Sequence, residues 1–160
     1  MIGKPPPQVH TRNMPQEGAR ARSAATHVEG VEKQMSRLPL VAIVDDDLAV
    51  RQSLAGLMRA LGYLAADFAS AEAFLSDPRR EDVDALITDL QMPGIGGIGL
   101  LRALQPLPPG MIAIVMTAFP SDANRNECLR LGARACLTKP ADSGLIADLL
   151  EAALGPGRAV

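Results

Sequence analysis

The chain has 160 residues, of which 48% are hydrophobic, so it is long and apolar enough for one buried core and is not disordered throughout. Aromatic residues make up only 2%, which argues against stacking on nucleic-acid bases. Residues 1–38 carry six Lys/Arg against three Glu, whereas residues 39–160 carry ten Lys/Arg against fifteen acids. The acidic main part argues against non-specific DNA binding and is compatible with a cation site.

The two cysteines, Cys128 and Cys136, form no CxxC pattern, and no secretion signal precedes them, so we expect reduced thiols. The longest uncharged stretch, residues 103–121, contains four prolines and is interpreted as loop, strand and loop rather than a membrane span. No apolar N-terminal segment precedes it. We therefore expect a soluble, cytoplasmic protein that binds no membrane.

Residues 1–37 are predicted to form a disordered or weakly ordered tail, because prolines and scattered charges leave no sustained apolar period. A short helix near residues 26–36 is possible within it. Met14 and Met35 are both candidate translation starts, so it stays open whether residues 1–34 are translated.

Residues 38–154 are predicted to form one domain, followed by a short C-terminal tail at residues 155–160. Short apolar runs predict five strands, at residues 40–44, 64–67, 85–88, 111–116 and 135–137. Apolar residues at helical spacing predict five helices, at about residues 47–61, after Ser70, at 97–104, from Ser121 or Asp122 to Leu131, and after Asp142.

This alternation of strand and helix predicts an α/β fold with a five-stranded parallel, doubly wound sheet of the flavodoxin-like kind. The expected strand order is 2-1-3-4-5, which places the topological switch point between the strands at residues 40–44 and 85–88. Ligands bind in such folds at the carboxyl ends of the strands. Asp45, Asp46 and Asp89 follow these two strands and are expected to meet there.

The residues at this edge predict a metal-assisted phosphoryl site. Neighbouring carboxylates repel each other, and a Mg²⁺ ion, which prefers oxygen ligands, relieves the repulsion. Asp46, Asp89 and the backbone carbonyl of Gln91 can supply such oxygens, and one carboxylate remains free to attack phosphorus. Thr117 and Lys139, which end the next strands, can contact phosphate oxygens. The expected product is an aspartyl phosphate.

Five sequence blocks in this order resemble the receiver domain of two-component response regulators, over about residues 38–154. Each block is modest alone, but their order and spacing together are specific. The blocks are Val44-Asp45-Asp46-Asp47, Thr88-Asp89-Leu90-Gln91-Met92-Pro93-Gly94, Gly97, Met116-Thr117-Ala118 and Thr138-Lys139-Pro140.

The resemblance implies that Asp89 is the phospho-acceptor, charged by a histidine kinase or a histidine phosphotransfer protein. It implies that Asp45 and Asp46 form the acid pocket for Mg²⁺, that Thr117 moves toward the phosphoryl group, and that Lys139 pairs with it. The bond from Lys139 to Pro140 would be cis. Such a protein is a signalling phospho-acceptor, not a turnover enzyme, with only self-phosphorylation and slow autodephosphorylation.

The resemblance also implies a switching face, formed by the helix at 122–131, the strand at 135–137 and the helix after Asp142. Phosphorylation would change this face and switch a downstream protein target, and a homodimer through the same face is possible. No direct nucleic-acid contact is expected. Because six residues follow Leu154, we expect a stand-alone receiver that acts through protein contacts or as a phosphate shuttle or sink.

The chain departs from the family pattern at several positions. Cys136 stands where Tyr or Phe is usual, three residues before the lysine, which questions an aromatic switch coupled to Thr117. Ala141 replaces a common aromatic residue, and Gly96 stands where an acid or small polar residue is frequent. Gln91 and Phe119 occupy the positions where the family tunes dephosphorylation.

Three alternatives remain open from the sequence. A haloacid-dehalogenase-type phosphatase would use Asp45 and Asp47 after the first strand, but Ala49 and the lack of a late acidic pair fit it poorly. A degenerate receiver would serve only as a binding module. A truncated response regulator would have lost its DNA-binding domain. The glycines at 94, 96 and 99 formally match a dinucleotide fingerprint, which we reject because Asp89 and Pro93 separate them from the strand.

Overall fold

The chain divides into two units, Met1–Arg37 and Leu38–Val160, and the computed structural model describes residues 37–157. The predicted N-terminal tail, apart from Arg37, lies outside the described residues and stays a prediction. The described residues form a five-stranded sheet in which all neighbouring strands are parallel, in the order β2-β1-β3-β4-β5. The predicted fold class and strand order are therefore confirmed. The strands are β1 (Leu40–Val44), β2 (Leu64–Phe68), β3 (Ala85–Asp89), β4 (Ile112–Thr117) and β5 (Ala135–Thr138).

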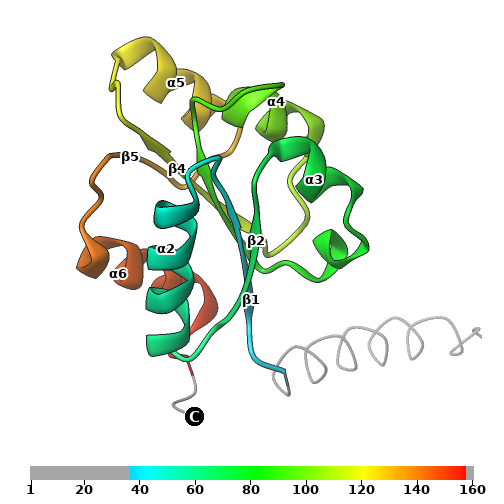
Figure 1. The fold of residues 1–160 in the computed structure, drawn as a ribbon, viewed down its shortest axis with the longest axis vertical. Helices are drawn as coiled ribbons and strands as arrows, with labels where there is room; N and C mark the ends of the chain where they lie inside the picture. Colours follow the sequence, from blue (N-terminus) through cyan, green and yellow to red (C-terminus); the bar gives the residue numbers. More distant parts are fainter. Residues whose placement is uncertain (1–36, 158–160) are drawn as a thin grey trace, which may run out of the picture. The chain divides into compact units, whose positions relative to one another are not determined.

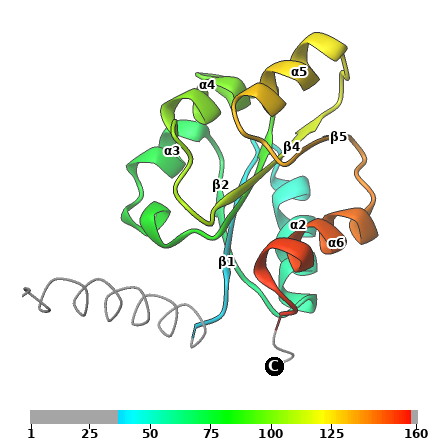
Figure 2. The ribbon, with the colours of Figure 1, turned by 180° about the vertical axis from the view of Figure 1, so that it is seen from behind.

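Helices cover both faces of the sheet (Figures 1 and 2). On one face, the buried cluster around Phe74, Leu86 and Leu100 lies beneath α3, α4 and α5. On the other face, the cluster around Ile43, Met58 and Ile146 lies beneath α2 and α6. The central strands β1 and β3 are buried on both faces, which explains their uninterrupted apolar sequences. The helices are α2 (Leu48–Ala60), α3 (Ala71–Ser76), α4 (Gly96–Ala103), α5 (Asp122–Arg130) and α6 (Ser143–Leu154).

Polar side chains start four of the five helices, as the sequence predicts. The side chain of Asp47 accepts hydrogen bonds from the first backbone amides of α2, and Ser70 does the same for α3. Ser121, rather than Asp122, caps α5, and Asp142 caps α6. Because each of these helices follows a parallel strand, the loop before it lies at the carboxyl edge of the sheet.

The boundaries differ from the prediction where a functional residue ends a strand. Asp89 and Thr117 are the last residues of β3 and β4, because their backbones still pair with Met116 and Thr138 of the next strand. A short 3₁₀ helix, Pro78–Asp82, was not predicted. Among residues 37–157, no helix has both the length and the apolar character needed to cross a membrane.

Candidate functional site

Three carboxylates meet at the predicted switch point. Asp45 directly follows β1 and Asp89 ends β3, and these two strands are neighbours in the sheet. Asp45, Asp46 and Asp89 each offer one oxygen, and these three oxygens lie within 4.8 Å of one another. Asp45 is 1% exposed and Asp89 6% exposed, whereas Asp46 is open to solvent. These three residues form the acidic pocket, in which the carboxylates of Asp45 and Asp89 are buried and that of Asp46 is exposed.

Lys139 reaches into the acidic pocket from the end of β5. Its Nζ lies 2.7 Å from Oδ2 of Asp45 and 3.3 Å from Oδ2 of Asp89. The backbone N–H of Lys139 donates to the carbonyl oxygen of Thr117 at 2.8 Å, which ties the end of β5 to the end of β4. The peptide bond from Lys139 to Pro140 is cis, as the resemblance implies.

Burial and neighbouring charges shift the pKa values of Asp89 and Lys139. Burial raises the pKa of Asp89; Lys139 opposes this rise, and the neighbouring charge of Asp45 adds to it. Burial lowers the pKa of Lys139, but its hydrogen bond to Asp45 and the charges of Asp45 and Asp89 outweigh burial and raise it. Lys139 is therefore held as a cation between two carboxylates.

Backbone amides orient the two buried carboxylates. The N–H of Asp47 donates to Oδ1 of Asp45 at 2.9 Å, and the N–H of Gln91 donates to Oδ1 of Asp89 at 3.3 Å. With Oδ2 bound to Lys139, both oxygens of Asp45 have protein partners. Asp47, the second acid of the phosphatase alternative, caps α2 with its Oδ1 and is not among the three acids that come together.

Thr117 contacts the side chain of Gln91, which the sequence did not predict. Oγ1 of Thr117 donates to Oε1 of Gln91 at 2.9 Å and accepts from the N–H of Phe119 at 3.1 Å. From the sequence, Gln91 was expected to offer its backbone carbonyl to the metal and to stand where the family tunes dephosphorylation, but no side-chain contact with Thr117 was expected. No sequence signal connects the two side chains, because Gln91 lies in the loop after β3 whereas Thr117 ends β4.

Arg51 and Glu72 support the loops around the acidic pocket, and neither role was predicted from the sequence. Arg51 of α2 donates to the carbonyl oxygen of Asp45 at 2.7 Å and pairs with Asp67 of β2 at 3.1 Å. Glu72 of α3 accepts from the N–H of Ile95 at 2.9 Å, and this hydrogen bond is the main cause that lowers the pKa of Glu72. These contacts hold the loops after β1 and β3.

Gly97 explains part of the glycine-rich loop after β3. A Cβ atom at this position would collide with the backbone carbonyl oxygen of Asp89. The N–H of Gly97 also donates to the carbonyl oxygen of Leu90 at 3.0 Å. The start of α4 therefore packs directly on the segment that carries Asp89, and only glycine allows that approach.

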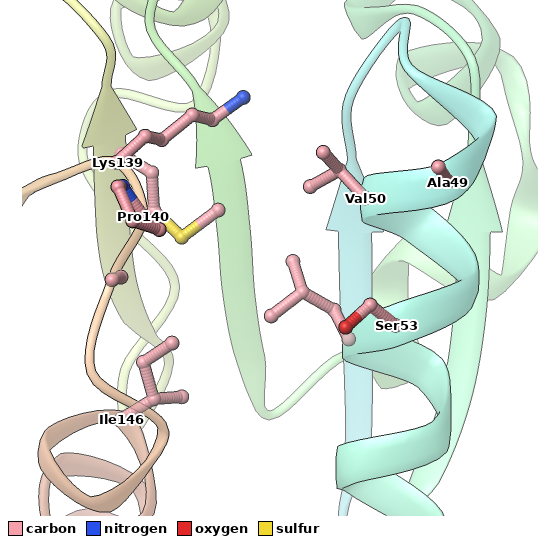
Figure 3. A pocket seen from close by; sticks show the side chains of 9 residues that line it. Ala49, Val50, Ser53, Lys139, Pro140 and Ile146 are labelled. Carbon is pink, nitrogen blue, oxygen red and sulfur yellow. The ribbon is translucent and has the colours of Figure 1, made fainter.

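A hollow of about 490 Å³ adjoins the acidic pocket between α2 and the connection from β5 to α6. Figure 3 shows Val50 and Ser53 of α2 on one side, Pro140 and Ile146 on the other, and Lys139 at one end. Lys139 is the single charged residue among those that line it, so the hollow itself offers no metal site. The remaining lining residues are Ala49, Leu54, Met116 and Ala141.

The donor set of the acidic pocket suits a small, hard divalent cation. It consists of carboxylate oxygens, with no thiolate or imidazole among the three residues that come together. Mg²⁺ prefers such oxygens and commonly retains several waters, which the exposed side at Asp46 allows. The arrangement is typical of the Mg²⁺ site of receiver domains.

Comparison with known proteins supports the same family. Residues 41–151 match the model of the response regulator receiver domain. The chain is 39% identical over 115 residues to the transcriptional regulatory protein FixJ of Azorhizobium caulinodans, a match that covers 72% of this chain and 54% of that protein. The chain thus spans about half the length of that relative.

Solved receiver structures have the same fold. A receiver domain protein from Methanospirillum hungatei is 29% identical, with a TM-score of 0.68, covering 74% of this chain and 94% of that one. A receiver protein from Burkholderia phymatum is 34% identical, with a TM-score of 0.64, covering 76% and 99%. Receiver domains are the signalling phospho-acceptors of two-component systems, partners of histidine kinases rather than catalytic enzymes. The chain belongs to the response regulator receiver family.

Proposed function

We propose that Asp89 accepts a phosphoryl group from the phosphohistidine of a histidine kinase or a histidine phosphotransfer protein, with Mg²⁺, and that the phosphorylated domain switches a protein partner. The observation that supports this most strongly is the meeting of three carboxylate oxygens within 4.8 Å at the carboxyl edge of the sheet. Lys139, which bridges the two buried acids, supplies the positive charge that phosphate oxygens require.

Asp89 is the best candidate for the nucleophile among the three acids. Both oxygens of Asp45 already have close partners, at 2.9 Å and 2.7 Å, so Asp45 is held in place. The contacts of Asp89 are longer, at 3.3 Å to the Gln91 amide and 3.3 Å to Lys139. An oxygen of Asp89 can therefore give up its contact with Lys139 and bond to phosphorus at a smaller cost in free energy than an oxygen of Asp45.

In the transfer step, an oxygen of Asp89 forms a bond to phosphorus while the bond from phosphorus to the donor imidazole nitrogen breaks. The imidazole keeps the electron pair of that bond. Asp46, Asp89 and the carbonyl oxygen of Gln91 would hold a Mg²⁺ ion there, and the ion would supply positive charge against the phosphoryl oxygens. Lys139 stays within reach of the new phosphoryl group, because its Nζ already lies 3.3 Å from Asp89.

Thr117 and the face around β5 carry the signal in this proposal. To contact a phosphoryl oxygen, the Thr117 hydroxyl must give up its bond to Gln91, and the end of β4 is bonded to the end of β5 through Lys139. Movement of Thr117 is thereby passed to the face formed by α5, β5 and α6. This face is the proposed contact for the downstream partner and for a homodimer. FixJ is a transcriptional regulatory protein, and a role of this chain in transcription is likewise a proposal.

Labelling with acetyl phosphate tests the acceptor. In the presence of Mg²⁺, reduction of the labelled protein with borohydride and peptide mapping should locate the phosphoryl group on Asp89. Asp89→Asn should abolish the label while its circular dichroism stays that of the natural protein. Asp148→Asn, which changes an exposed acid of α6, is the matched control and should label normally. A label on Asp45 with steady release of phosphate would support the phosphatase instead.

A further inference from the structure

The two cysteines lie side by side on the face of the sheet that α3, α4 and α5 cover. Cys128 is a fully buried residue of α5, and Cys136 of β5 packs against the same cluster. The chain reverses after α5, and the N–H of Ala133 donates to the carbonyl oxygen of Cys128 at 2.9 Å, so β5 runs back along the helix. Burial raises the pKa of the Cys128 thiol to about 12, and the adjacent Cys136 thiol contributes to that rise.

Cys136, unlike Cys128, reaches the surface. It lines a pocket of about 150 Å³ between the loop after β4 and the strand β5. This volume has room for a few water molecules, at about 30 Å³ each. Five of the seven lining residues carry hydroxyl or charged groups, so a small polar oxidant can enter the pocket and approach Cys136. The lining residues are Thr117, Pro120, Ser121, Asp122, Arg125, Cys136 and Thr138.

The strand that carries Cys136 has room to adjust. Among the described strands, β5 lies at the edge of the sheet and pairs with β4 alone. A disulfide requires its two sulfurs at about 2.0 Å, closer than thiols in van der Waals contact. Because β5 is held by strand hydrogen bonds on one side only, it can shift toward α5 without disturbing β1 and β3.

We propose that Cys136 is an oxidation site of this protein and that Cys128 is its resolving thiol, so that a hydroperoxide converts the pair into an intramolecular disulfide. First, the Cys136 thiolate attacks the peroxide, the O–O bond breaks, and Cys136 becomes a sulfenic acid as the second oxygen leaves as water or alcohol. The Cys128 sulfur then attacks the Cys136 sulfur, the S–O bond breaks, and the Cys128 proton leaves with the hydroxide as water. Two thiols are oxidised by two electrons, and one peroxide is reduced.

The disulfide would act on the acidic pocket through Thr117. It would join α5 covalently to β5 beside the pocket that Thr117 lines. Just past the end of β5, the backbone N–H of Lys139 donates to the carbonyl oxygen of Thr117. The disulfide would therefore restrain α5 and β5, the two elements that follow Thr117 in the chain. The oxidation chemistry needs no phosphoryl transfer, so it can be tested separately from the proposed function.

Peptide mapping of the full-length protein after exposure to hydrogen peroxide tests the proposal. We expect a loss of mass of two hydrogens, a peptide that links Cys128 to Cys136, and reversal by dithiothreitol. In the folded, reduced protein, iodoacetamide should label Cys136 and leave Cys128 unmodified until urea is added. Cys128→Ser should leave a sulfenic acid at Cys136 that dimedone traps, and Cys136→Ser should give neither product.

Folding controls are needed before the results for the serine variants can be interpreted. Circular dichroism must show that both serine variants fold, and Cys128→Ala replaces Cys128→Ser if the hydroxyl is not tolerated in the core. The proposal is overturned if no linked peptide forms in the natural protein, if the only disulfide joins two chains, or if Cys136→Ser is oxidised at Cys128 as fast as the natural protein. None of these results depends on whether Asp89 accepts phosphate.

Discussion

The hydroxyl of Thr117 donates its single proton to Oε1 of Gln91 at a distance of 2.9 Å. A hydroxyl has one hydrogen to donate, so Thr117 cannot donate to Gln91 and to a phosphoryl oxygen together. The hydrogen bond between Gln91 and Thr117 therefore opposes the change that phosphorylation is proposed to cause. It joins the loop after β3 to the end of β4, directly beside the acidic pocket.

Replacing Gln91 by alanine should favour the phosphorylated form. The lost hydrogen bond contributes about 1 kcal/mol to the unphosphorylated form, which corresponds to about a fivefold gain in the ratio of phosphorylated to unphosphorylated protein. The ratio is measured on Phos-tag gels with acetyl phosphate and Mg²⁺. The matched test repeats the change in a Thr117→Ala background, where the gain should disappear. An equal gain in both backgrounds would show that Gln91 acts on the site without Thr117.

Replacing Lys139 by methionine should destabilise the protein when Mg²⁺ is absent. Asp45 is 1% exposed, and without Lys139 its charge is buried with no cation beside it. Lost hydrogen bonds to charged groups cost about 2 kcal/mol, which should appear in urea unfolding with EDTA. Asp45→Asn together with Lys139→Met should recover much of the loss. A single variant as stable as the natural protein would contradict the importance of this pair.

Mg²⁺ should raise the unfolding temperature, because it binds the folded acidic pocket and relieves the repulsion among its acids. At a concentration ten times the dissociation constant, the gain is about 1.4 kcal/mol. Asp46→Asn should reduce the gain, since it removes an exposed ligand without burying a new group. Asp148→Asn should retain it. A shift of equal size in Asp46→Asn would place the ion elsewhere.

Glu127 should stabilise the protein in a pH-dependent way. Arg130 and Arg102 hydrogen-bond to it and lower its pKa from 4.5 to about 2. Because the folded state has the lower pKa, the stabilisation is complete above pH 4.5 and is lost as the pH falls toward 2. The difference in urea midpoint between the natural protein and Glu127→Gln should therefore shrink over this window. A difference independent of pH would contradict the ion pairing.

The order of strands and the meeting of Asp45, Asp46 and Asp89 were predictable, because a parallel α/β pattern determines which strand ends are neighbours. Lys139 was predictable for the same reason, since it follows the last strand. The contacts that side chains make between loops were not predictable from the sequence. The side chain of Gln91, the guanidinium of Arg51 and the carboxylate of Glu72 find partners through loop conformations that no periodic pattern encodes. The proximity of Cys128 to Cys136 likewise depends on how the chain reverses after α5.

The most direct test of the central claim is a crystal structure of the protein with Mg²⁺ and beryllofluoride, which mimics a phosphoryl group on a carboxylate. We predict beryllium bonded to an oxygen of Asp89, with Thr117 Oγ1 and Lys139 Nζ on its fluorines. Mg²⁺ should bind Asp46, Asp89 and the carbonyl oxygen of Gln91. An adduct on Asp45 or Asp46, or a metal ion bound outside the acidic pocket, would contradict the account.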